Sequence, residues 1–193
     1  ASLIDVFPTG TVFLCVVDPG VGGDQAAIAV EADGRWFVGP DNGLFQIVLQ
    51  HANSITAWNI TWRPEQLSAS FHGRDLFAPV AAKLAIGETP PGDPVPVASL
   101  HPTDWPDDLA EIIYIDNFGN AMTGLRARNL AMKGRLEAGG HMMDRFRTFS
   151  DLPGGASFWY ENSSGLAEIA VNQDRADRIL GLAIGDPVHV HDS

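Results

Sequence analysis

Two segments of this chain combine side chains that can exchange a proton with glycines that allow tight turns. They are Asp18-Pro19-Gly20-Val21-Gly22-Gly23 and Phe71-His72-Gly73-Arg74-Asp75. A carboxylate at the mouth of a strand can accept a proton, and histidine is the side chain whose ordinary pKa lies nearest neutrality, so it can accept or orient a proton of water. Each segment follows an extended stretch, where α/β proteins keep their chemistry. The first hypothesis is therefore a small-molecule site.

Each segment also has a purely structural interpretation. A glycine-rich turn can expose backbone amides to an anion or a water, but it is more often only a turn. Asp18 could simply cap neighbouring amides, because a carboxylate there is costly unless it is paired or used. Asp75 would suit the positive end of a helix, and Arg74 would pair with a carboxylate.

The elements around these segments predict an α/β domain over residues 1–88. Residues 11–17 (TVFLCVV) are typical of a strand buried on both faces. Residues 26–30 and 36–38 flank Asp33-Gly34, a strong hairpin signal, so the sheet should be mixed. Helical spacing predicts helices over 42–51 and 77–86, the second ended by Gly87. Strands that alternate with helices indicate the α/β class.

A segment rich in proline and glycine, residues 89–107, predicts a linker to a second domain over 108–193. There, glycine turns separate short strands and there is little helical periodicity, which favours a small β-barrel or a sandwich. The predicted strands are 112–115, 158–160, 167–171 and 188–191, with one helix over 174–180. The loops Asp116-Asn117-Phe118-Gly119-Asn120 and Tyr160-Glu161-Asn162-Ser163-Ser164-Gly165 suit tight hairpins. They also present hydroxyl, amide and carboxylate groups, which could form hydrogen bonds to an amino acid or a nucleobase.

Composition narrows the classes of partner. The 24 acidic against 12 basic residues, a net charge of -12, argue against nucleic acid, whose affinity comes largely from Lys and Arg. No apolar run approaches the roughly 20 residues that cross a bilayer. Cys15 is the single cysteine, so no disulfide can form within the chain, and we expect a reducing, cytoplasmic compartment. We expect its side chain to be a small buried apolar group. His189 and His191 share one face of a strand, but two ligands do not make a metal site.

Five ordered segments resemble the S-adenosyl-L-methionine (SAM) hydroxide adenosyltransferases, the hydrolytic relatives of the fluorinase and the chlorinase. The resemblance implies that water or hydroxide attacks the ribose 5′ carbon of SAM and releases adenosine and L-methionine, with no metal or cofactor. It also implies an α/β domain followed by a β-barrel, and homotrimers whose ligand lies between the first domain of one subunit and the second domain of its neighbour. The five segments are Val16-Val17-Asp18-Pro19-Gly20-Val21-Gly22, Gly39-Pro40-Asp41-Asn42-Gly43-Leu44, Phe71-His72-Gly73-Arg74-Asp75-Leu76-Phe77-Ala78-Pro79, Ile115-Asp116-Asn117-Phe118-Gly119-Asn120 and Asn162-Ser163-Ser164-Gly165.

Carried over by position, the resemblance assigns roles to individual residues. Asp18 and His72 match the pair that handles water, whereas the halogenating relatives have tyrosine in place of Asp18. A carboxylate there would repel a halide but can accept a proton from water, which favours hydrolysis. Asp116 and Ser163 match residues that hold the amino and carboxylate groups of methionine. Asn120 would read adenine and Phe149 would stack on it. The substrate-binding set is Gly73, Asp116, Asn120, Phe149, Ser163, Ser164 and Gln173.

The chain departs from the family pattern in two places. The hydrolases carry an arginine as a third catalytic residue seven positions after the aspartate, and Gln25 stands there in this chain. A neutral amide cannot act as a cation, so we expect slower turnover. The family also opens with a Thr-Asp-Phe-Gly motif that binds the ribose hydroxyls, and its absence predicts a chain truncated at its start. These departures keep open a non-catalytic protein that binds SAM or a nucleoside, and a halogenase is the third alternative.

Overall fold

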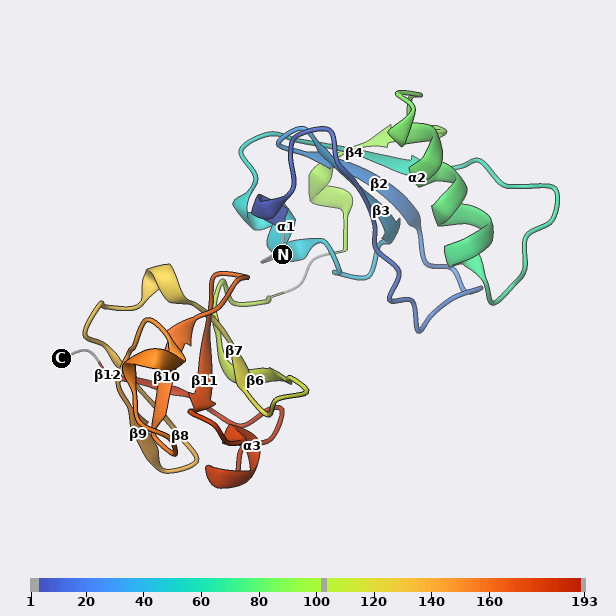
Figure 1. Cartoon of the computed structure of the whole chain (residues 1–193). Coiled ribbons are helices and arrows are strands. Elements are labelled where there is room, and N and C mark those ends of the chain that lie inside the picture. Colours follow the sequence, from blue (N-terminus) through green and yellow to red (C-terminus); the bar gives the residue numbers. More distant parts are fainter. Residues whose placement is uncertain (1–3, 102–103, 192–193) are drawn as a thin grey trace. The chain divides into compact units, whose positions relative to one another are not determined.

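The computed structural model describes residues 4–101 and 104–191. The chain forms two compact units, the first ending at Trp105 and the second beginning at Pro106 (Figure 1).

The first unit contains a mixed sheet of five strands. These are β1 (Val12–Leu14), β2 (Ala27–Ala32), β3 (Arg35–Pro40), β4 (Ile55–Ile60) and β5 (Gly92–Val95), in the order β1-β3-β2-β4-β5. Only the β1–β3 pair is parallel. Asp33 (φ 47°) and Gly34 (φ 75°) form the two-residue turn between β2 and β3. Two positive φ angles are what the favoured hairpin turn requires, so the predicted hairpin is confirmed.

Alternate residues of β2 point into two hydrophobic cores, one on each face of the sheet. Ala27 and Ala29 pack in a cluster with Val80 and Leu84 of α2 (Ala78–Ala85). Ile28 and Val30 pack on the other face, in a cluster that includes Val48 and Leu49 of α1 (Gln46–His51). The period of two along the strand therefore places one helix on each face. Figure 1 shows α2 lying along the sheet. The predicted mixed α/β architecture is confirmed.

The first strand and the linker differ from the sequence prediction. Residues 11–17 do not form a strand buried on both faces: β1 covers only Val12–Leu14, it lies at the sheet edge with β3 as its partner, and the Leu14 and Val17 side chains are 47% and 64% exposed. A continuous apolar run cannot distinguish an edge strand from a central one. The sequence analysis did not predict β4, and β5 lies within residues 89–107, the segment predicted as a linker. Pro94 is compatible with β5 because it is also an edge strand.

Both predicted helices begin later than the pattern indicated. α1 starts at Gln46 because Asn42 and Gly43 form a turn, in which Asn42 Oδ1 accepts from the Leu44 amide. α2 is preceded by a π-helical turn, η2 (Gly73–Phe77). Gly87 (φ 86°) ends α2 as predicted. Short 3₁₀ turns complete the chain: η1 (Ile4–Val6), η3 (Val97–Ser99), η4 (Ala127–Asn129) and η5 (Phe149–Asp151).

The second unit consists of two antiparallel sheets. β10 (Ser157–Glu161), β11 (Leu166–Val171), β7 (Ala121–Arg126) and β6 (Leu109–Ile115) form one in that order, and β12 (His189–His191), β8 (Arg135–Ala138) and β9 (His141–Met143) form the other. α3 (Ala176–Ile179) follows β11. The predicted small β-barrel is not found as a closed barrel in the described residues. Isolated bridges, Glu111–Pro187 and Arg145–Trp159, join β6 and β10 to the segments that precede β12 and follow β9, and neither extends into a ladder.

An ion pair stabilises the beginning of the η2–α2 segment. Arg74 Nε lies 2.6 Å from Asp75 Oδ1, and the Ser68 amide donates to Asp75 Oδ2 at 3.0 Å. These two interactions lower the pKa of Asp75 from its ordinary value of 3.8 to about 2, with Arg74 the larger cause. Both residues thus have the structural roles that the sequence favoured.

Replacing Asp75 should make stability less dependent on acid pH. Because the pKa is depressed in the folded state, ionised Asp75 stabilises the fold above pH 3.8, and this contribution is lost as the pH falls through about 2. Asp75→Asn should therefore lower Tm at neutral pH, and the difference from the wild type should shrink across that interval. Thermal unfolding followed by circular dichroism at several pH values measures it. A constant difference at all pH values would contradict the assignment.

Candidate active site

The Asp18 loop is held at the end of β1 by the loop that follows β3. Asn42 Nδ2 donates to the Val17 carbonyl at 2.8 Å, and within the loop the Val21 amide donates to the Asp18 carbonyl at 3.3 Å. Gly22 has a φ of 81°, and a Cβ there would overlap the backbone oxygen of Ala69. Glycine is therefore required for the Asp18 loop to approach the segment that leads to His72.

A second close contact, between Gly73 and Val16, also joins these two segments. His72 lies at the start of η2, and the next residue, Gly73, packs against Val16 so closely that a Cβ would be 3.1 Å from Val16 Cγ1. Two glycines, Gly22 and Gly73, thus allow the strand end with Asp18 and the helix start with His72 to lie side by side. Gly73 does not line the cavity described next.

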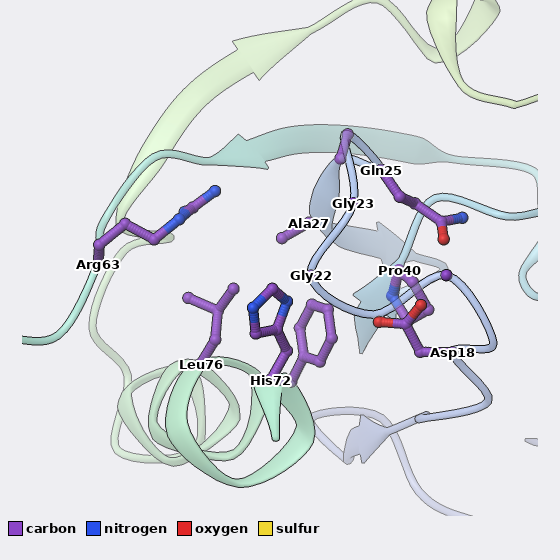
Figure 2. A pocket seen from close by; sticks show the side chains of 12 residues that line it. Asp18, Gly22, Gly23, Gln25, Ala27, Pro40, Arg63, His72 and Leu76 are labelled. Carbon is purple, nitrogen blue, oxygen red and sulfur yellow. The ribbon is translucent and has the colours of Figure 1, made fainter. Parts of the chain in front are cut away.

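Asp18 and His72 line one small cavity of about 140 Å³. Figure 2 shows the Asp18 carboxylate directed toward His72, whose ring rises from η2 next to Leu76. Asp18 Oδ1 is buried and has no hydrogen-bond partner, the one such side-chain atom in residues 4–101 and 104–191. A buried oxygen without a partner is costly, and a water or a ligand in the cavity would satisfy it. The full lining is Asp18, Gly20, Gly22, Gly23, Gln25, Ala26, Ala27, Pro40, Arg63, His72, Leu76 and Phe77.

Gln25 and Arg63 contribute the remaining polar groups of this cavity. Gln25 Oε1 and Asp18 Oδ1 both lie close to Gly20. A Cβ added to Gly20 would be 3.0 Å from the first oxygen and 4.0 Å from the second. Arg63 comes from the segment after β4 and reaches in from the side opposite Asp18 (Figure 2). Its Nη1 donates to the Ile60 and Trp62 carbonyls at 2.7 and 2.8 Å. The sequence analysis did not single out Arg63.

A larger cavity, about 700 Å³, lies in the second unit beside the 116–120 turn. Asp116 organises this turn: Oδ1 accepts from the amides of Phe118 and Asn120, at 2.9 and 2.8 Å, and Oδ2 accepts from Asn120 Nδ2 at 3.0 Å. The carboxylate thereby fixes the orientation of the Asn120 side-chain amide. The lining is Asp116, Phe118, Asn120, Phe149, Tyr160, Val171, Gln173, Asp174 and Arg175.

A buried carboxylate orders one wall of this cavity and the neighbouring loop. Glu168, 6% exposed, accepts from Tyr160 Oη at 2.5 Å and from Asn162 Nδ2 at 2.8 Å. Asn162 Oδ1 in turn accepts from the Ser164 and Leu166 amides. Burial, followed by the bond to Glu168, raises the pKa of Tyr160, so its hydroxyl stays protonated as a donor.

The structure thus brings together most, but not all, of the predicted site residues. Asp18, Gln25 and His72 share the smaller cavity, and Asp116, Asn120, Phe149 and Gln173 share the larger. Gly73, Ser163 and Ser164 line neither, although the two serines belong to the loop that Asn162 orders. Arg63 and Arg175 are lining residues to which the sequence assigned no role. They lie in segments without a motif, and only the folded loops bring them to the cavities.

Other candidate features are weaker. His191 Nε2 lies 2.8 Å from Glu137 Oε2, and in the part of the chain that the structure describes no three His, Cys, Asp or Glu residues are placed to hold a metal ion. Over the same residues, no helix has both the length and the apolar composition needed to cross a bilayer. Burial raises the pKa of the Cys15 thiol.

Comparisons with known proteins agree on one family. The SAM hydroxide adenosyltransferase N-terminal domain matches residues 1–92, and the C-terminal domain of that family matches residues 110–189. The (R)-S-adenosyl-L-methionine hydrolases of Thermus thermophilus and Salinispora arenicola are 41% and 37% identical to this chain. The matches cover 95% and 93% of this chain and 76% and 74% of those proteins.

A solved structure extends the likeness to three dimensions. The structure of an uncharacterized conserved protein from Thermotoga maritima superposes with a TM-score of 0.87 at 29% identity, over 98% of this chain and 80% of that one. The two family domains together cover most of the sequence, and the relatives match along nearly all of it. This chain therefore belongs to the SAM hydroxide adenosyltransferase family.

Proposed function

We propose that this protein hydrolyses SAM to adenosine and L-methionine, with Asp18 and His72 handling the attacking water. The observation that carries the proposal is the buried, partnerless Oδ1 of Asp18 in a cavity that His72 also lines. A cavity of about 140 Å³ suits water and the end of a substrate rather than a whole nucleoside. The names of the relatives support the same reaction.

In the proposed reaction the oxygen of water attacks the ribose 5′ carbon in line with the departing sulfur. The carbon–sulfur bond breaks, its electron pair goes to sulfur, and the positively charged sulfonium becomes the neutral thioether of methionine. Asp18 and His72 accept hydrogen bonds from the water, and one of them takes the proton that it loses. The sulfonium is already a good leaving group, so alignment should matter most, with positioning worth roughly 7–11 kcal/mol.

The larger cavity is proposed to hold the adenosine and methionine parts of the substrate. Asn120 has a fixed side-chain amide that can read the edge of adenine, and Phe149 offers an aromatic face for stacking. Asp116 and Gln173 would contact the amino acid, together with Ser163, Ser164 and Gly73. The net charge of -12 would draw the cationic substrate inward, with a strength that falls as salt is added.

Three further parts of the proposal come from the family resemblance and from composition. Residues 1–88 would act as the catalytic domain and 108–193 would bind the ligand, with 89–107 as the linker. The protein would form a homotrimer in the cytoplasm, with each site shared between two subunits. The reaction would need no metal or other cofactor. Native mass spectrometry tests the assembly, and activity after dialysis against a chelator tests metal independence.

Incubation with SAM, followed by chromatographic separation of the products, tests the function. Adenosine and L-methionine in equal amounts support hydrolysis. Intact SAM with measurable binding would instead support a binding protein, which Gln25 at the arginine position favours. A halogenated nucleoside in the presence of chloride or fluoride would indicate a halogenase.

Gln25→Arg should speed this reaction, because an arginine there would add a cation to the cavity that Gln25 lines beside Asp18. We expect kcat for adenosine release to rise, with little change in KM, since Gln25 lies at the smaller cavity rather than the larger. Steady-state kinetics of the wild type and the variant measure this. An unchanged or lower kcat would contradict the expectation.

A further inference from the structure

One buried charged side chain supports a wall of the larger cavity without lining it. Glu168 lies within β11, all six residues of which are buried, and it is 6% exposed. Among residues 4–101 and 104–191 no other acidic or basic side chain is buried, and no lysine or arginine of these residues forms an ion pair with Glu168. A buried carboxylate without a cation is costly to the fold, so its two hydrogen bonds must explain what it contributes.

The first oxygen of Glu168 holds an aromatic side chain of the cavity. Oε1 accepts from Tyr160 Oη at 2.5 Å, and the two residues are directly opposite each other on β11 and β10. The Tyr160 ring packs against Phe149 at an angle of 64°, with the ring centroids 5.3 Å apart, and both rings line the cavity. Glu168 therefore fixes the ring that supports Phe149, the proposed stacking partner of adenine.

The second oxygen of Glu168 holds the loop between β10 and β11. Oε2 accepts from Asn162 Nδ2 at 2.8 Å. A side-chain amide has its donor and its acceptor on different atoms, so with Nδ2 held by Glu168 the oxygen faces the loop. There Oδ1 accepts from the Ser164 and Leu166 amides at 2.9 and 3.0 Å. The shape of the loop that carries Ser163 thus depends on the same carboxylate.

We infer that Glu168 is a positioning residue for substrate binding, which joins the aromatic wall of the larger cavity to the 162–165 loop and keeps both in the geometry that binds the ligand. Glu168 itself does not line the cavity. Its two bonds act on the two parts of the ligand, because Phe149 is proposed to stack on adenine and Ser163 to contact the amino acid. This inference rests on the proposed hydrolysis of SAM, which supplies the ligand, and it concerns binding rather than the chemical step.

Glu168→Leu tests the role by removing both acceptors, so that the Tyr160 hydroxyl and Asn162 Nδ2 lose their partner. Kd for adenosine should rise by roughly tenfold, the scale for leaving a buried hydrogen-bonding group without its partner. KM for SAM should rise in parallel. The value of kcat at saturation should change little, because Asp18 and His72 line the other cavity. Unchanged Kd and KM would overturn the inference.

Glu168→Gln is the conservative variant that should rescue binding. Its oxygen can accept from Asn162, and its nitrogen can donate to Tyr160 Oη, because a hydroxyl can accept as well as donate. Both bonds can thus be kept without the charge, so Kd and KM should stay close to those of the wild type. A Glu168→Gln variant as weak as Glu168→Leu would show that the charge matters and not the positioning.

A general loss of stability would give a different pattern. A fraction of unfolded protein lowers the number of adenosine sites and the apparent kcat, but it leaves Kd and KM of the folded molecules unchanged. Thr123→Val is the matched control: Thr123 is fully buried in β7, its Oγ1 donates to the Ala167 carbonyl at 2.8 Å, and it does not line the larger cavity. This variant should lower Tm and leave Kd unchanged. A rise in Kd equal to that of Glu168→Leu would overturn the inference.

Tyr160→Phe tests the aromatic side of the network alone. It removes only the hydroxyl that Glu168 holds, so Kd for adenosine should rise when Glu168 is present. In the Glu168→Leu background the bond is already absent, and Tyr160→Phe should have little further effect, because residues that share one interaction are not additive. The same effect in both backgrounds would show that the two residues act independently, contrary to the inference.

Calorimetry with adenosine separates this inference from the proposed function, because binding can be measured without turnover. A protein that releases no adenosine from SAM, but binds adenosine more weakly after Glu168→Leu, would uphold the role of Glu168 and refute the hydrolysis. A protein that hydrolyses SAM with the same KM before and after Glu168→Leu would overturn the role of Glu168 alone. A wild type that neither binds adenosine nor hydrolyses SAM would refute both.

Discussion

Asp18→Asn should lower kcat for adenosine release by roughly 10²- to 10⁴-fold, the range for loss of a group that assists proton transfer. An amide cannot take the proton, and its nitrogen would offer the water a donor where the reaction needs an acceptor. The affinity for adenosine should stay the same, because Asp18 does not line the larger cavity. Product chromatography gives kcat, and calorimetry with adenosine gives the affinity.

Stability provides an independent sign of the same role. Asp18 Oδ1 is buried without a partner, and leaving a carboxylate oxygen unpaired generally costs a folded protein more free energy than leaving an amide group unpaired. Asp18→Asn should therefore raise Tm while it lowers kcat, as replacement of a functional group often does. Asp24→Asn, an exposed neighbour that does not line the cavity, should change neither. A lower Tm for Asp18→Asn would mean that the carboxylate is a structural cap.

The sequence predicted what depends on local chemistry. The Asp33-Gly34 hairpin and the glycine end of α2 followed from backbone preferences that few residues satisfy. Arg74 was expected to pair with a carboxylate, and that carboxylate is its chain neighbour Asp75. Asp18 and His72 were predicted as separate candidates, and the resemblance implied that they act together.

The features that the sequence did not predict depend on contacts between segments that are distant in the chain. β4 lies between β2 and β5 in the sheet, and its sequence ITAWNI alternates only weakly. The closeness of the Asp18 loop to η2 depends on a backbone contact of Gly22 with Ala69, which no spacing rule reveals. Arg63 lines the cavity from the segment after β4, where the Trp62 amide donates to the carbonyl of Pro91, a residue distant in the sequence. Likewise, β6 and β10 meet the segments that precede β12 and follow β9 through single bridges, where a barrel would need ladders.

The second large effect should come from Asp116→Ala, which removes the acceptor that three donors of one turn share. The amides of Phe118 and Asn120 and the Asn120 side chain would lose their partner, and the Asn120 amide would no longer have a fixed orientation. We expect Kd for adenosine to rise by about 10²-fold, or about 2.8 kcal/mol, comparable to the loss of one charge-assisted hydrogen bond. KM for SAM should rise in parallel, whereas kcat at saturation should change far less. Isothermal titration calorimetry and steady-state kinetics measure the two quantities.

Two further variants determine whether the turn or the charge is responsible. Asp116→Asn keeps an oxygen for the two backbone amides but presents a donor to Asn120 Nδ2, so its Kd should lie between those of the wild type and Asp116→Ala. Asp144→Ala removes an exposed carboxylate of the same unit that does not line the larger cavity, and it should bind adenosine normally. If Asp116→Ala binds adenosine as tightly as Asp144→Ala does, the ordered turn is not part of the adenosine site. An Asp116→Asn variant as weak as Asp116→Ala would assign the effect to the lost charge, because the backbone bonds of the turn would still be present.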